Sequence, residues 1–332
     1  MLPAGGMLFL LSNFFSKNPW RPMVTEKSFG AACAGMSDVV KWDASGGVEA
    51  CLQATRKKIL RRLWPALLVF LAALAALELL WPVLRQSGTV PVNDGVGTIY
   101  IVPDPALPAN TLDSGDFTRQ GDAVLYTGSR YTASQGVDVS EWQREIRWQE
   151  VADGGIDFAV IRCGYRRYVS GSLEQDTFFE ENYSAAGTAG LRRGVYFFSQ
   201  AVSVAEAQEE AAFVLQMLAG RPLELPIFYD WETVTAEEGR ANSLDGKTVT
   251  ACAAAFCRAI EQAGYTAGIY FNLQMGYHTY NLSPLKDYTL WIAEPGKYPS
   301  FYYHAALWQY DHSGTVPGID TPADRNLLFE GL

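Results

Sequence analysis

Apolar residues beyond position 135 alternate between two periods. Short apolar runs of strand length are followed by longer segments in which apolar residues recur at helical spacing. The clearest of these segments begins after a capping box, Ser203 and Glu206, and stops at Gly220. Repeated strand–helix units predict a parallel sheet. The predicted strands are 136–139, 158–163, 194–198, 225–229, 267–271, 289–293 and 305–310, and the predicted helices are 145–152, 176–189, 204–219 and 248–262.

Residues 135–332 have the length and strand content of a small, irregular (β/α) barrel. We expect a TIM-like α/β arrangement of about five βα units plus extra strands, with the active site at the C-terminal ends of the strands. Acids and aromatic residues stand near these ends, which suits a cleft that binds sugars. They are Asp138, Tyr165, Phe198, Asp230, Glu232, Tyr270, Asn272, Trp291, Glu294, Trp308 and Gln309, with Asp324 in the final segment.

Two of these acids, Asp230 and Glu232, end one apolar strand at positions i and i+2. Side chains alternate faces along a strand, so this spacing places both carboxyls on one side. Two carboxyls held together can differ in protonation, as glycoside hydrolysis requires. The simpler alternatives are a surface glutamate at Glu232, a strand-end cap at Asp138 and a turn residue at Asp324.

A long apolar run from Leu63 to Leu84 has the length of a transmembrane helix. Basic residues cluster before it and only Arg85 follows closely, so the positive-inside rule places the N-terminus in the cytoplasm. The alternative is a buried core helix. The predicted organisation is a cytoplasmic tail at 1–62, a signal anchor at 63–84 in the lipid bilayer of the cell membrane, an extracellular stalk at 85–134 with a small hairpin near 98–102, and an extracellular catalytic domain at 135–332.

Composition narrows the possible chemistry. A net charge of −10 argues against nucleic acid as a partner, and a hydrophobic fraction of 48% is ample for a core. Cys163, Cys252 and Cys257 are expected to be core residues, because their spacing fits neither a disulfide framework nor zinc. The three histidines lack metal-ligand spacing, and no Gly-x-Ser-x-Gly elbow occurs. We therefore expect no metal and no cofactor.

An ordered set of motifs resembles the family 25 glycoside hydrolases, the N-acetylmuramidase type of lysozyme. The departures are Arg147, Arg325 and the Glu294-Pro295 pair, none of which removes one of the four acids. The motifs are Gly136-Val-Asp-Val-Ser-Glu-Trp-Gln143, Ile156-Asp-Phe-Ala-Val-Ile-Arg-Cys-Gly-Tyr165, Gly194-Val-Tyr-Phe-Phe-Ser199, Leu225-Pro-Ile-Phe-Tyr-Asp-Trp-Glu232, Gly268-Ile-Tyr270, Leu290-Trp-Ile-Ala293, Leu307-Trp-Gln-Tyr310, Asp320 and Ala323-Asp-Arg-Asn326.

The resemblance implies that the chain cleaves the β-1,4 bond between N-acetylmuramic acid and N-acetylglucosamine in peptidoglycan glycan strands. Glu232 would be the general acid, and Asp230, kept ionised, would orient the substrate's acetamido group, while Asp138 and Asp324 would tune the acid and bind substrate. An inverting route, with Asp230 or Asp324 activating water, stays open. Expected substrate-binding residues are Tyr165, Tyr196, Tyr229, Tyr270, Trp291, Trp308 and Asn326, with Trp231 as a further stacking candidate.

Two other functions fit the same sequence. One is a non-catalytic module that binds or scaffolds cell-wall glycans on the same fold. The other is a hydrolase of a different N-acetylated glycan. Retention of all four acids favours an enzyme over a binding module.

Overall fold

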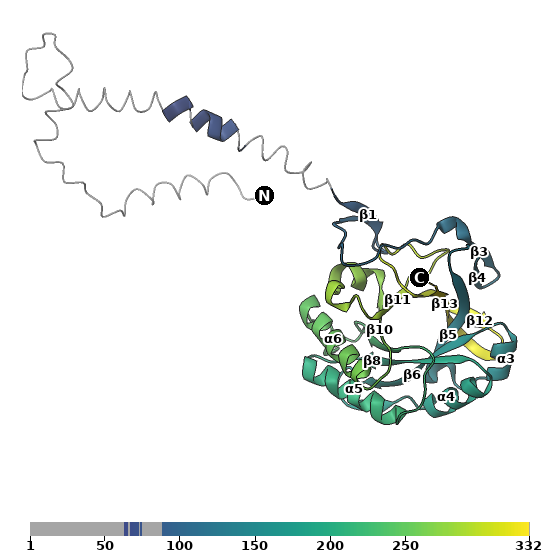
Figure 1. Ribbon diagram of the computed structural model, residues 1–332. Helices are drawn as coiled ribbons and strands as arrows, with labels where there is room; N and C mark the ends of the chain where they lie inside the picture. The colour runs from purple at the N-terminus through teal and green to yellow at the C-terminus, as the bar shows by residue number, and fades with distance from the viewer. Residues whose placement is uncertain (1–62, 66, 73, 75–87, 332) are drawn as a thin grey trace, which may run out of the picture. The chain divides into compact units, whose positions relative to one another are not determined.

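The computed structural model describes residues 63–65, 67–72, 74 and 88–331 (Figure 1). Residues 88–331 belong to one compact unit, Val83–Leu332. Within the described residues, no helix is long and apolar enough to cross a membrane. The predicted cytoplasmic tail and much of the predicted anchor at 63–84 lie outside the described residues. The anchor therefore stays a prediction.

Eight strands close into a barrel, which confirms the expected barrel-like α/β fold. Neighbouring strands are parallel except at β13, which runs antiparallel to both of its neighbours and closes the ring. The final segment is therefore a barrel strand, and the sheet is not wholly parallel as expected. Around the ring the order is β5 (Thr132–Val139), β13 (Ile319–Glu330), β12 (Leu307–Val316), β11 (Thr289–Ala293), β10 (Ala267–Asn272), β9 (Ile227–Trp231), β8 (Arg192–Ser199) and β6 (Phe158–Arg166), with β7 (Leu173–Gln175) paired on β6.

Four α-helices connect the first strands, close to their predicted positions. Helix α5 begins at Val204 as expected, because the Ser203 side chain accepts a hydrogen bond from the Glu206 backbone N–H. After β10 the pattern changes to a short π-helix, η3 (Met275–Thr279), and a 3₁₀ turn, η4 (Ser283–Leu285). The α-helices are α3 (Trp148–Asp153), α4 (Phe179–Thr188), α5 (Val204–Leu218) and α6 (Gly246–Gln262), and Figure 1 shows them along one arc of the barrel.

Alternation along each strand separates a small inner core from a larger outer one. The inner core is crowded: a Cβ on Gly136 would lie 2.1 Å from the Phe158 ring, and one on Gly268 would lie 2.4 Å from the Phe228 ring. Only glycine leaves these two rings room to fill the barrel. These side chains fill the interior of the barrel. Chemistry is therefore confined to the end of the barrel at the C-termini of the parallel strands, which we call the upper end. Inner-core residues are Phe158, Val160, Phe228, Tyr270, Trp291, Ala293, Leu307 and Leu328.

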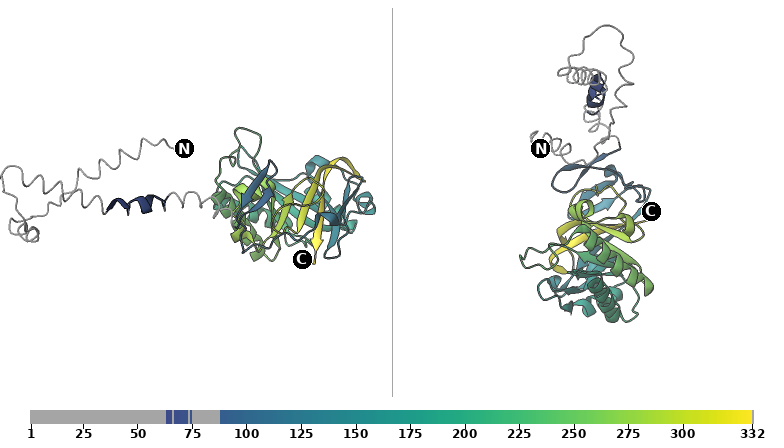
Figure 2. Two further views of the ribbon diagram at one scale, coloured as in Figure 1. Left: turned by 90° about the horizontal axis from the view of Figure 1, so that it is seen from above. Right: turned by 90° about the vertical axis from the view of Figure 1, so that its left-hand side faces the viewer.

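The N-terminal segment of the unit covers the part of the barrel that lacks α-helices (Figures 1 and 2). It forms two antiparallel hairpins, β1 (Val90–Asn93) with β2 (Thr98–Ile101) and β3 (Phe117–Gln120) with β4 (Ala123–Tyr126). The strand expected near 98–102 is confirmed as β2.

This segment is not the stalk predicted for 85–134, because from residue 88 onward it contains elements packed on the barrel. Phe117 makes edge-to-face ring contacts with Trp308 on β12 and Phe329 on β13, with centroids 5.6 and 6.0 Å apart. These outward-facing aromatic residues have no helix above them and are buried by the segment instead. The catalytic unit therefore begins before residue 135.

Candidate active site

The four predicted acids meet at one cavity of about 250 Å³ at the upper end of the barrel. Strand register brings them together: Asp138 is paired with Asp324, and Asp230 lies between Phe198 and Tyr270. The prediction that Asp230 and Glu232 share one side of their strand is confirmed. The cavity is lined by Asp138, Val139, Ser140, Trp142, Gln143, Arg162, Tyr196, Phe198, Asp230, Glu232 and Asp324.

Asp138 and Asp324 form a cross-strand pair that protein donors hold in place. The Asp138 Oδ2 accepts hydrogen bonds from Gln309 Nε2 at 2.8 Å and Asn326 Nδ2 at 2.7 Å. Gln309 Nε2 also donates to Asp324 Oδ2 at 3.2 Å. Burial and the neighbouring Asp138 raise the pKa of Asp324 to about 9, so at neutral pH its proton can be donated to Asp138.

Asp230 and Glu232 form a same-strand pair with less support from the protein. Asp230 is 5% exposed, and its Oδ1 atom has no hydrogen-bond partner among the described residues. Burial, followed by Glu232 and Asp138, raises the pKa of Asp230, while Arg162 opposes this effect. Burial and then Asp138 raise the pKa of Glu232 to about 7. Glu232 is therefore suited to be protonated near neutral pH, but an ionised Asp230 would need a further donor, contrary to the simple expectation that it stays ionised.

The same alternation that aligns Asp230 with Glu232 sends their neighbours to the outer face. Tyr229 is fully buried against Phe256 of α6, and Trp231 packs on Tyr280. Trp308 is also fully buried outside the lumen, where its Nε1 donates to the Glu294 backbone carbonyl at 2.8 Å. The expectation that Tyr229, Trp231 and Trp308 contact substrate is therefore wrong.

Three other predicted binding residues lie beneath the acids rather than in the cavity lining. The Tyr270 hydroxyl donates to Gln309 Oε1 at 2.9 Å, and Trp291 Nε1 donates to Asn326 Oδ1 at 2.8 Å. Asn326 itself is fully buried and donates to Asp138. Tyr270, Trp291 and Asn326 thus hold acids and amides in position, and their predicted direct contact with substrate is not supported by this burial.

The remaining two predicted residues lie at the opening. Tyr196 lines the acid cavity, and Tyr165 lines an adjoining cavity of about 420 Å³ that shares Trp142, Arg162 and Phe198 with it. The Arg162 guanidinium lies 5.0 Å from the Tyr165 ring centroid. Both tyrosines therefore line the two cavities at the opening.

Sequence reasoning missed Arg162 and Trp142 as site residues, and it placed Gln309 at a strand end without giving it a role. Arg162 donates to Asp176 at 2.7 Å and to Glu141 at 2.9 Å, so its positive charge is fixed beside the acids. It is the one charge within the apolar start of its strand, a signal that marks the lumen side. Trp142 is 73% exposed on the cavity wall, where its indole is available for stacking.

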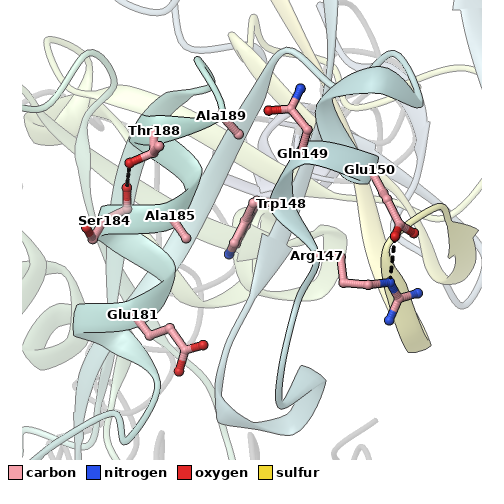
Figure 3. A pocket seen from close by; sticks show the side chains of 9 residues that line it. All are labelled: Arg147, Trp148, Gln149, Glu150, Glu181, Ser184, Ala185, Thr188 and Ala189. Carbon is pink, nitrogen blue, oxygen red and sulfur yellow. Dashed lines mark hydrogen bonds and ion pairs between the residues drawn. The ribbon is translucent and has the colours of Figure 1, made fainter.

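Other hollows do not contain the four acids. A groove of about 620 Å³ lies between α3 and α4, and Arg147 at its edge is bonded to Glu150 at 3.0 Å (Figure 3). In the part of the chain that the structure describes, no group of three or more His, Cys, Asp or Glu side chains could hold a metal ion. The convergence of carboxyls, rather than cavity size, identifies the candidate site.

Comparisons with known proteins agree with this geometry. The sequence model of glycosyl hydrolases family 25 matches residues 137–319, more than half of the chain. The uncharacterized protein YegX of Escherichia coli K12 is 29% identical over 211 residues, which cover 59% of this chain and 69% of that protein. The autolytic lysozyme of Clostridium acetobutylicum is 25% identical over 200 residues, covering 60% of this chain and 56% of the lysozyme.

Solved structures share the fold. A family 25 glycosyl hydrolase from Bacillus anthracis gives a TM-score of 0.51 at 22% identity, covering 60% of this chain and 90% of that one. The modular autolysin LytC of Streptococcus pneumoniae gives 0.53 at 21% identity, covering 72% and 56%. With the family match across the strands that carry Asp138, Asp230 and Glu232, the chain belongs to glycosyl hydrolase family 25 and is a glycosidase of the lysozyme type.

Proposed function

We propose that this chain hydrolyses peptidoglycan at the β-1,4 bond between N-acetylmuramic acid and N-acetylglucosamine. The observation that carries the proposal is the Asp230–Glu232 pair, in which a carboxyl with a pKa of about 7 stands beside a buried carboxyl with an unpartnered oxygen. The similarity to a protein named an autolytic lysozyme supports peptidoglycan as the substrate. Trp142, Tyr165 and Tyr196 provide aromatic surface for the sugar rings.

Glu232 is the general acid. Its proton passes to the glycosidic oxygen as the bond from that oxygen to C1 breaks, and the sugar acquires oxocarbenium character. The raised pKa keeps this proton available near neutral pH, whereas an ordinary glutamic acid would have lost it. Glu232 then holds a negative charge close to the developing positive charge.

Asp230 orients the acetamido group of the substrate. The acetamido N–H donates to the unpartnered Asp230 Oδ1, and this hydrogen bond favours the ionised form of the carboxyl. The acetamido carbonyl oxygen attacks C1 and forms an oxazolinium ion, which Asp230 stabilises. Ionisation of Asp230 is thereby linked to substrate binding. Water next attacks C1, Glu232 takes up a proton from that water, and the acetamido group is restored.

Asp138 and Asp324 support this chemistry without reacting. The Asp138 carboxyl raises the pKa of Glu232, and Asp324, with a pKa of about 9, is already protonated near neutral pH and so cannot accept a proton from water. That protonation argues against the inverting route in which Asp324 activates water. Asp230 remains the only rival base on the reacting strand.

The test is reducing-end release from purified peptidoglycan by the full-length protein and Glu232→Gln. We expect release by the wild type, with N-acetylmuramic acid at the new reducing ends by mass spectrometry, and almost none by the variant. N-acetylglucosamine at the new reducing ends would show that the enzyme cleaves the other linkage of the strand instead of the proposed one. Equal release by both proteins would refute Glu232 as the acid, and binding without release by the wild type would favour a non-catalytic glycan module.

The stereochemistry tests the assisted route separately. Proton NMR of the first product should show the β-anomer before mutarotation. An initial α-anomer would overturn the retaining proposal and favour an inverting one.

We further propose that the anchor at residues 63–84 holds the enzyme at the cell membrane with its catalytic unit outside. The support is the sequence pattern alone: an apolar run of spanning length after a basic cluster. Fractionation and protease treatment of intact cells should find the protein in the membrane fraction and its C-terminal unit digested. Recovery in the soluble fraction would contradict the proposal.

A further inference from the structure

The β1–β2 hairpin belongs to a segment that precedes the family match at residues 137–319. Its turn nevertheless shares a cavity with residues at the C-terminal ends of β10 and β11, the end of the barrel where the acids lie. Its turn is built locally: Asp94 Oδ1 accepts hydrogen bonds from the backbone N–H groups of Val96 and Gly97, both at 2.9 Å. Gly95 has a φ of 93°, a conformation that side chains other than glycine rarely adopt. The residues of the turn therefore determine its conformation.

Two hydrogen bonds fasten this turn to the segment that follows β10. Asp94 Oδ2 lies 2.8 Å from His278 Nε2, and Gln274 Nε2 donates to the Asp94 backbone carbonyl at 2.8 Å. Asp94 is only 6% exposed as a result. The hydrogen bond with His278, together with the turn N–H groups, holds the pKa of Asp94 well below its usual range, so the carboxylate is ionised. The hairpin is thus held at the rim by polar contacts.

A cavity of about 350 Å³ opens between the hairpin and the rim. Its walls come from residues 93–95 of the turn, 272–274 after β10 and 293–295 after β11. The register pairs Tyr270 with Asp230, so continuing the two parallel strands by two residues places Asn272 alongside Glu232. The cavity therefore lies on the β10–β11 side of the general acid, opposite the aromatic wall of Trp142 and Tyr165.

The chemistry of its walls is mostly neutral. The two carboxylates near it are occupied by protein donors: Asp94 as above, and Glu294 by the backbone N–H groups of Ser300 at 2.9 Å and Phe301 at 3.1 Å. The wall amides each make one hydrogen bond to the protein, through Asn93 Oδ1, Asn272 Oδ1 and Gln274 Nε2. What remains is the other polar atom of each amide and backbone, interleaved with Leu273, Ala293 and Pro295. Amides with apolar patches suit a ligand that carries hydroxyl and acetamido groups, whereas the buried acids disfavour an anion.

Building on the proposed function, we propose that this cavity is an additional glycan subsite for a neutral N-acetylated hexosamine, with the β1–β2 hairpin as its outer wall. The hairpin extends the cleft beyond the family domain. The enzyme then binds longer glycan strands more tightly than short ones, because only a longer strand spans the acids and reaches the hairpin.

The test compares kcat/KM on peptidoglycan-derived glycans of two and of four disaccharide units, with the full-length chain. His278→Ala and Gln274→Ala each remove one fastening bond, so we expect each to lower kcat/KM on the longer glycan about tenfold and to leave the shorter glycan unchanged. His278→Gln keeps a donor toward Asp94 and should restore the length preference. Val96→Ala is the control, because this side chain is 86% exposed at the turn and does not line the cavity.

Unchanged length preference in both alanine variants would overturn the subsite, as would equal losses on both glycans. Calorimetric titration with the N-acetylglucosamine pentamer separates this inference from the proposed function. Weaker pentamer binding by both variants than by the Val96→Ala control would uphold the subsite even for a protein that hydrolyses neither glycan. Equal binding by all of them would overturn it even for an active muramidase.

Discussion

The two carboxyl pairs of the active site are built in different ways. Asp230 and Glu232 come from one parallel strand, β9, in the half of the barrel that α5 and α6 cover. Asp138 and Asp324 come from β5 and β13, strands from opposite ends of the barrel sequence that pair antiparallel. The second pair lies beside the wall that the N-terminal segment covers.

The pairs also differ in how far the protein satisfies them. Asp138 accepts hydrogen bonds from two buried amides, whereas Asp230 Oδ1 has no partner in the described part of the chain. Buried polar atoms without partners are uncommon, and a site for a ligand is one reason for them. Protein donors alone hold the cross-strand pair, whereas the proposed function has substrate supply the missing partner of Asp230. This difference supports the proposed assignment of the reaction to β9 and of the tuning to β5 and β13.

The largest effect should come from the same-strand pair. Glu232→Gln removes the transferable proton, and we expect kcat on peptidoglycan to fall by roughly 10²–10⁴-fold. Glu237→Gln is the matched control, since Glu237 is exposed a few residues further on, and its kcat should stay within about twofold. Equal kcat for both variants would place the acid elsewhere.

The cross-strand pair should respond unequally. Asp138→Asn presents an amide to the Gln309 and Asn326 donors and leaves buried hydrogen bonds unmade, so kcat/KM at pH 7 should fall roughly 10- to 100-fold. Asp324→Asn retains a donor toward Asp138, and its kcat/KM should stay within about threefold. Equal losses would show that Asp324 reacts directly, and the distinction between the pairs would fail.

The contribution of the N-terminal segment to the stability of the barrel can be measured with two variants of that segment. Phe117→Ala removes a half-buried ring that packs on Trp308 and Phe329, and we expect a loss of about 2 kcal/mol in the free energy of unfolding. Tyr100→Ala, on the same segment but 67% exposed, should cost less than about 0.5 kcal/mol. Urea unfolding of the full chain measures both. No difference between them would mean that the segment contributes nothing to the barrel.

The pH dependence of stability tests the raised pKa of Glu232 without reference to catalysis. The folded pKa of Glu232, about 7, is raised above its ordinary value of 4.5, so its stabilising contribution is complete below pH 4.5 and is lost as pH rises through 7. Glu232→Gln has no such loss, so its free energy of unfolding relative to that of the wild type should rise between pH 4 and pH 8. Thermal unfolding at both pH values measures this. A constant difference across pH would contradict the raised pKa.

The part of the active site on β9 could be predicted from the local sequence pattern. Two acids at i and i+2 after an apolar strand require only strand alternation to be placed together, and the helix from Val204 needed only its cap. The same alternation rule excludes Tyr229 and Trp231 from the lumen, because each is one residue away from an inward-facing acid. Their assignment to the cleft is wrong because an aromatic residue at a strand end reaches the cleft only from an inward-facing position.

The part of the structure formed by β5, β13 and the N-terminal hairpins could not be predicted from the local sequence pattern. The direction of β13 is set by its pairing with β5, nearly the whole barrel earlier in the sequence, and no period within residues 319–330 specifies it. From sequence alone, residues 88–134 resemble a polar linker. The role of their few aromatic residues is evident only from packing on the outer faces of Trp308 and Phe329. Contacts of this range depend on topology rather than on local sequence.

The most direct test of the division between a reacting and a tuning pair is a carbon-13 NMR titration of the side-chain carboxyls in the full-length protein. We predict two carboxyls with midpoints of about 7, of which the Glu232 signal is absent in Glu232→Gln while that of buried Glu210 remains, and one of about 9 that is absent in Asp324→Asn. Titration of every carboxyl below about 5, the ordinary range for carboxylic acids, would contradict the account. So would an unchanged pair of signals with midpoints of about 7 in Glu232→Gln, where only that of Glu210 should remain.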